Sequence, residues 1–96
     1  MKRYKVIVEG RNCLLPAEGT LRRMGFFGTR FVKAHDAAAA EKMAIETVQR
    51  ELMEMIVNPA ENPPNLSIDN IQEQGPLCRW WRAIKGFSWY REDEIG

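Results

Sequence analysis

One long amphipathic stretch, residues 36–57, most constrains how this chain can fold. It reads DAAAAEKMAIETVQRELMEMIV. Asp36 is placed to cap the helix, because its carboxylate can accept an unpaired amide N–H of the first turn. Asn58-Pro59 ends the pattern, since a residue before proline is held out of the helical region. At about 100° per residue, one apolar face suited to packing on a sheet forms from Ala37, Ala40, Ala44, Ile45, Val48, Leu52, Met55 and Ile56.

The opposite side of this predicted helix is charged, with residues of alternating sign four apart that can pair with one another. These residues are Lys42, Glu46, Arg50 and Glu54. Met43 and Met53 fall on the same side. They are either scattered surface methionines or a small partner-facing patch, because methionine suits adaptable contacts.

The residues before the helix predict two antiparallel strands. Residues 4–9 alternate, with Tyr4, Val6 and Val8 on one face and Lys5, Ile7 and Glu9 on the other. Residues 10–12 interrupt this strand as a bulge, residues 13–15 continue it, and residues 16–19 form a turn. Residues 21–34 read as a long second strand, rich in phenylalanine and in basic side chains.

The residues after the helix predict a loop, a third strand and a short last strand. Residues 58–65, NPAENPPN, exclude regular structure. Residues 66–73 form the third strand, with a bulge near Asp69-Asn70 that brings Ile71 back into phase. Residues 87–90, FSWY, form the last strand, and residues 91–96 are a charged tail.

The stretch from residue 75 to residue 86, GPLCRWWRAIKG, predicts a short aromatic helix over residues 77–85. Leu77, Trp80, Trp81 and Ile84 recur at helical spacing. Such a face packs in the core or in a protein interface. A third interpretation is nucleic-acid binding, because Arg79 and Arg82 flank the tryptophans, and aromatic rings can stack on bases while arginines contact phosphates.

The order strand, strand, long helix, strand, short helix, strand predicts the fold class. We expect a single α+β domain over residues 1–96, a two-layer sandwich with an antiparallel sheet and the long helix packed on one face. On the uncovered sheet face we expect part of the set Lys5, Ile7, Phe26, Arg30 and Val32.

Composition limits the class of protein. Hydrophobic residues make up 45% of the chain, and no apolar run has the length of a membrane span. The first residues read as a strand and not as a signal peptide, so we expect a cytoplasmic protein with no membrane association. Cys13 and Cys78 lack metal-ligand spacing, so we expect no cofactor or metal. In a chain without an export signal we expect two buried or half-buried thiols, with a disulfide as the less favoured alternative.

Charge is unevenly distributed along the chain. Residues 1–35 have a net charge of +6 and residues 36–77 a net charge of −6, although the whole chain is only +1. This division is typical of an anion-binding sheet face, or of strands and a helix that neutralise each other after folding. The small total charge favours the second interpretation.

Two short motifs resemble a group of small uncharacterised bacterial proteins. The first is Gly25-Phe26 followed by Thr29-Arg30-Phe31-Val32 and Ala34, a GFxxTRFVxA pattern before an Ala/Glu-rich helix. The second is GFxWY at residues 86–90, followed by acids. The resemblance implies the same fold and a bacterial setting, and it implies no activity.

The residues capable of catalysis show no catalytic pattern. His35 has only Asp36 beside it, and neither serine stands in a nucleophile elbow. We therefore predict a non-enzymatic interaction module, a homodimer that associates through an apolar sheet face and the tryptophan segment, with another protein as a less favoured partner. Its candidate interface comprises Trp80, Trp81, Met43, Met53, Ile7, Phe26 and Val32. The alternative is nucleic-acid binding, in which Trp80 and Trp81 act together with Arg22, Arg23, Arg30, Lys33, Arg79 and Arg82.

Overall fold

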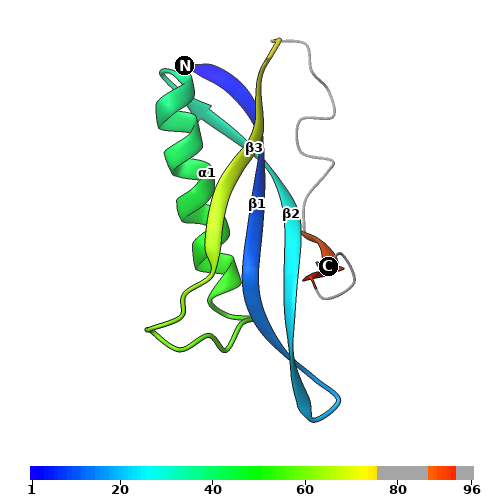
Figure 1. Ribbon diagram of the computed structural model, residues 1–96. Helices are drawn as coiled ribbons and strands as arrows, with labels where there is room; N and C mark the ends of the chain where they lie inside the picture. Colours follow the sequence, from blue (N-terminus) through cyan, green and yellow to red (C-terminus); the bar gives the residue numbers. More distant parts are fainter. Residues whose placement is uncertain (76–86, 93–96) are drawn as a thin grey trace.

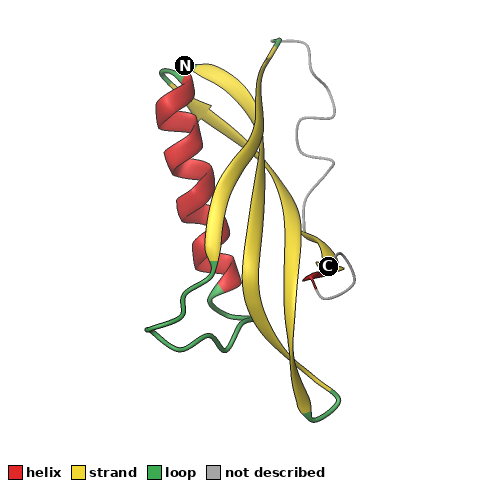
Figure 2. Ribbon diagram, viewed as in Figure 1, coloured by secondary structure: helices red, strands yellow, loops and turns green. Residues whose placement is uncertain are grey.

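A computed structural model describes residues 1–75 and 87–92, which form an antiparallel sheet and one helix (Figures 1 and 2). The strands are β1 (Lys2–Ala17), β2 (Thr20–Ala34), β3 (Asn65–Gln74) and β4 (Phe87–Arg91), in the spatial order β3-β1-β2-β4. The helix α1 (Ala37–Leu52) lies along one face of the sheet. The predicted α+β class is confirmed, whereas the short helix predicted over residues 77–85 lies outside the described residues.

Strands β1 and β2 form a long hairpin. Glu18 and Gly19 connect them with φ angles of +50° and +82°, the left-handed conformation that tight hairpin turns require. The pairing register shifts between Gly10 and Cys13, where Asn12 has a φ of +59°. The predicted bulge of the first strand is confirmed. The turn predicted over residues 16–19 is confirmed only at Glu18 and Gly19, because Pro16 and Ala17 belong to β1 and pair with β2.

The helix begins where its cap was predicted. The Asp36 carboxylate accepts a hydrogen bond from the Ala39 amide at 2.8 Å. Small residues line the first half of the buried stripe and larger residues the second half: Ala40, Ala44, Val48 and Leu52. They pack on Val6, Val8 and Phe26, which are fully buried in the same core.

The helix ends at Leu52, so the prediction that it extends to residue 57 is wrong. The Leu52 carbonyl accepts the amides of the final turn, and the Val57 amide then donates to the Leu14 carbonyl of β1 at 2.9 Å. The Asn58 side chain also bonds to β1, where it accepts from the Leu14 amide at 2.8 Å and donates to the Asn12 carbonyl at 2.7 Å. The Val57 amide thus bonds to β1 in place of a helical carbonyl, and the Asn58 side chain holds this turn against β1.

The third strand has the predicted bulge. Ile7 is opposite Asn70 and Val8 is opposite Ile68, so Asp69 is the additional residue. The shift restores the phase of Ile71, which packs with Ile68 against the core beneath α1. Within the described residues, no helix is long and apolar enough to cross a membrane.

The assignment of β2 side chains to the two sides of the sheet was wrong. Phe26, Arg30 and Val32, expected on the uncovered face, pair with Gly10, Val6 and Tyr4 and therefore share the side that α1 covers. Alternation correctly placed the three residues on one side of the strand, but alternation alone does not show which side of a strand packs against a helix.

Two of these side chains are buried for different reasons. Phe26 is fully buried, because Gly10 opposite it has no side chain and leaves room for its ring. Arg30 is 9% exposed, forms an ion pair with Glu51 of α1 and lies 5.0 Å over the centre of the Phe87 ring.

Candidate functional site

The side of the sheet opposite α1, here the open face, is basic and aromatic. The β1–β2 register brings Lys5, Ile7 and Glu9 of β1 opposite Phe31, Thr29 and Phe27 of β2. From β3 the face receives polar, uncharged side chains, including Ser67, Asn70 and Gln72. The basic members of the open face are Arg3, Lys5, Arg11, Arg23 and Lys33, and its aromatic members are Phe27, Phe31 and Tyr90.

The acidic side chains of α1 and of the turns at its two ends lie on the other side of the sheet. Five of the eight acids in residues 36–77 belong to α1, its cap and its C-terminal turn: Asp36, Glu41, Glu46, Glu51 and Glu54. The only helix–sheet ion pair between described residues is the one between Glu51 and Arg30. The folded chain therefore keeps much of the charge separation that its sequence displays.

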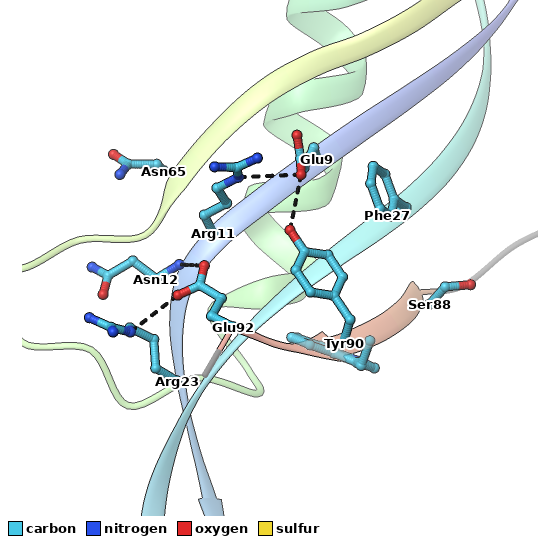
Figure 3. Close-up of a pocket in the computed structure, with 10 residues that line it drawn as sticks. Glu9, Arg11, Asn12, Arg23, Phe27, Asn65, Ser88, Tyr90 and Glu92 are labelled. Carbon is cyan, nitrogen blue, oxygen red and sulfur yellow. Dashed lines mark hydrogen bonds and ion pairs between the residues drawn. The ribbon is translucent and has the colours of Figure 1, made fainter. Parts of the chain in front are cut away.

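A hollow of about 890 Å³ opens where β1, β2 and β4 meet on the open face (Figure 3). Its charged lining residues are Glu9, Arg11, Arg23 and Glu92. Its uncharged lining residues are Asn12, Phe27, Asn65, Ser88, Trp89 and Tyr90. The hollow is large enough for a small ligand or for one unit of a chain molecule.

Glu9 organises one wall of the hollow. Its Oε2 accepts a hydrogen bond from the Tyr90 hydroxyl at 2.9 Å and a second from Arg11 Nε at 3.3 Å (Figure 3). Burial, followed by the hydrogen bond to Glu9, raises the pKa of Tyr90. The hydroxyl therefore keeps its proton at neutral pH and acts as the donor in this bond.

Glu92 organises the adjacent wall in the same way. Its Oε1 accepts from the Asn12 amide at 2.8 Å, and its Oε2 pairs with Arg23 Nε at 3.2 Å. The left-handed backbone of Asn12 belongs to the β1 bulge, which thus presents an amide to the Glu92 carboxylate. The Asn12 side chain donates to the Asn62 side chain at 2.8 Å, which ties the loop after α1 to this wall.

Arg11 and Arg23 are both anchored through the Nε atom of the guanidinium group. Arg11 and Arg23 each use Nε for a carboxylate, and these side chains are 66% and 62% exposed. In the part of the chain that the structure describes, neither guanidinium has a second carboxylate partner. The outer nitrogens therefore remain accessible, and their planar geometry matches a carboxylate or a phosphate.

Two aromatic rings form the floor of the hollow. Phe27 and Tyr90 lie with centroids 5.6 Å apart and ring planes tilted by 36°. The Tyr90 ring covers Gly25, where any side chain would overlap it. Phe27 is 38% exposed, so an uncovered part of its ring is available to a planar ligand.

The structure places the predicted site residues in several locations. Among the anion-contact candidates, Arg23 lines the hollow, Lys33 is exposed on the open face, Arg22 lies on the other side of β2, and Arg30 is buried. Among the interface candidates, Ile7 is half-buried on the open face, and Phe26 and Val32 lie under α1. Met43 and Met53 are exposed on α1 and at its end. The remaining candidates, Trp80, Trp81, Arg79 and Arg82, lie outside the described residues.

Sequence reasoning missed most of the hollow. Glu9 and Phe27 were correctly placed in alternating strands, but nothing marked them as parts of one site. Tyr90 and Glu92 come from the C-terminal strand and its end, about 80 residues from their partners Glu9 and Asn12. One usable signal was the acid after FSWY, because a carboxylate close to a strand can anchor an arginine of a neighbouring strand.

Cys13 is buried beside this site, where its thiol is shielded from solvent. Burial, together with the nearby Glu92 charge, raises the pKa of its thiol to about 11.

No group of three or more His, Cys, Asp or Glu side chains within residues 1–75 and 87–92 is arranged to hold a metal ion. Comparisons with protein-family models, with curated proteins and with solved structures found no match.

Proposed function

We propose that this chain is a two-layer, non-enzymatic binding module that holds single-stranded nucleic acid on the open face of its sheet. The observation that carries the proposal is the presence of an aromatic pair, the exposed Phe27 and the half-buried Tyr90, among five basic side chains on one face. Basic grooves with aromatic platforms bind single strands, because arginine and lysine contact phosphates while bases stack on the rings.

The open face favours a single strand over a duplex. Bases of a duplex are stacked on one another and cannot reach the rings of Phe27 and Tyr90, whereas unpaired bases can. The polar side chains that β3 contributes, such as Asn70 and Gln72, offer hydrogen-bond partners to bases or sugars without adding negative charge. The acidic side chains of α1 face away from this surface and would repel phosphate on the opposite side of the molecule.

Two lysines offer a matched test. Lys33 lies on the open face and Lys42 on the exposed side of α1, and both are solvent-exposed. Fluorescence anisotropy with a labelled single-stranded oligonucleotide, at several salt concentrations, measures the affinity of Lys33→Gln and Lys42→Gln.

We expect Lys33→Gln to weaken binding and to reduce the salt slope by about 0.7, the value for one lost phosphate contact. Lys42→Gln should behave as the parent chain. Equal effects of the two substitutions would contradict binding on the open face.

Self-association is a second candidate, favoured by a different surface. Met53 is 65% exposed and borders an apolar hollow of about 380 Å³ between the end of α1 and the loop that follows it. Ile56 and the loop residues Pro59, Pro63 and Pro64 also line it. A homodimer would bury this surface. Light scattering at high micromolar concentration distinguishes a dimer from a monomer, and Met53→Lys should dissociate a dimer that uses this surface.

A further inference from the structure

We infer that the hollow on the open face binds one nucleoside phosphate unit, with its phosphate at Arg11 and Arg23 and its base on the Phe27 ring. This inference rests on the proposed function and specifies which part of the open face binds one nucleoside phosphate unit. General basic charge is not sufficient for such binding, because the anionic group and the planar group of the ligand contact separate parts of one hollow.

The two arginines are prepared for an anion before any ligand binds. Glu9 and Glu92, whose side chains are 17% and 19% exposed, each fix the Nε edge of one guanidinium. The carboxylates are themselves anchored by the Tyr90 hydroxyl and the Asn12 amide at 2.9 and 2.8 Å. An anchored arginine loses little side-chain freedom when its outer nitrogens bind a phosphate, and this preorganisation increases affinity.

The opposite part of the hollow suits a planar, uncharged group. Phe27 presents an exposed ring beside Tyr90, and Ser88, which pairs with Phe27 across β2 and β4, adds an exposed hydroxyl. Aromatic stacking accepts every nucleobase, since each base has a π face. The Ser88 hydroxyl can donate to or accept from the edge of a base or a ribose.

The ligand chemistry has two possible sources, a free mononucleotide or one nucleotide of a strand. Isothermal titration calorimetry with adenosine monophosphate, adenosine and inorganic phosphate measures the binding of a single nucleotide and of its two parts. We expect saturable binding of the monophosphate and much weaker binding of adenosine or phosphate alone. Displacement of a labelled oligonucleotide by the monophosphate would show that strand and unit share the hollow. Binding of the monophosphate without any oligonucleotide binding would identify the free nucleotide as the ligand.

Substitutions then test the assigned residues. Arg11→Gln and Arg23→Gln should each weaken monophosphate binding at least about fivefold. Arg23→Lys should not restore it fully, because lysine lacks the planar pair of donors. Arg22→Gln is the matched control, since Arg22 precedes Arg23 in β2 and lies on the other side of the strand. Unchanged far-UV circular dichroism would show that each variant folds.

Three results would overturn the inference. The first is wild-type affinity in both Arg11→Gln and Arg23→Gln. The second is equal loss in Arg22→Gln. The third is oligonucleotide binding that depends on Lys33 but is not displaced by monophosphate, which would leave the proposed function standing. Absence of binding by both the oligonucleotide and the monophosphate would overturn the proposed function as well.

Discussion

The Tyr90 hydroxyl donates a hydrogen bond to the Glu9 carboxylate, although their strands are not neighbours in the sheet. Strand β2 lies between β4 and β1, and the Tyr90 ring crosses it above Gly25. A side chain at position 25 would overlap this ring. One wall and the floor of the hollow therefore depend on the absence of a side chain at Gly25.

Gly25→Ala should displace the Tyr90 ring and break its bond to Glu9. We expect a loss of about 1–3 kcal/mol in the free energy of unfolding, as for other overpacked sites, together with weaker monophosphate binding. Denaturant unfolding and calorimetry measure the two effects. Gly75→Ala is the control, because no atom lies within 4 Å of the Cβ it would add. Equal stability of the two variants would contradict the placement of Tyr90.

Leu52→Ala should weaken the domain far more than Glu46→Ala. Leu52 is fully buried at the end of α1, and its removal leaves a cavity that costs about 2–5 kcal/mol. Glu46 is exposed on the other side of α1, where the loss of helix pairs costs a few tenths of a kcal/mol. Thermal unfolding followed by circular dichroism measures both variants. Similar melting temperatures would mean that α1 is rotated relative to its position in the structure.

Glu51→Ala should cost about 1–3 kcal/mol in unfolding free energy, the range for removing one partner of a buried polar group. Arg30, its partner on β2, is nearly buried and would lose the carboxylate that pairs with it. Glu54→Ala removes an exposed carboxylate from the C-terminal turn of the same helix and should change stability by less than about 0.5 kcal/mol. Urea unfolding of the two variants tests the difference. A Glu51→Ala variant as stable as Glu54→Ala would show that the ion pair contributes nothing.

Local signals were strong enough to predict most of the elements. The Asp36 cap, the hairpin turn that ends at Gly19 and the Asp69 bulge each follow from a few adjacent residues, and all three are present. The helix end was missed because Val57 and Asn58 bond to β1, a partner distant in sequence. The hollow was missed for the same reason. Its walls depend on the pairing of β4 with β2, and local pattern does not give that register.

Alkaline pH should destabilise the chain through Cys13. Its thiol pKa is about 11 in the folded state, against about 8.5 for an unperturbed thiol. The unfolded state therefore loses its proton first, and unfolding becomes more favourable as pH rises through the interval between these values. Melting temperatures from pH 8 to pH 11 measure this effect. Cys13→Ala should show a shallower fall than the parent chain, and an equally steep fall would contradict burial of the thiol.

The most direct test of binding on the open face is a nuclear magnetic resonance titration of ¹⁵N-labelled protein with an unlabelled single-stranded oligonucleotide. We predict that the largest amide shifts fall on residues of the open face, including Arg23, Phe27, Lys33 and Tyr90. The exposed residues of α1, such as Lys42 and Glu46, should not shift. Shifts confined to α1 and the loop after it, or no shifts at a saturating concentration, would contradict the proposed function.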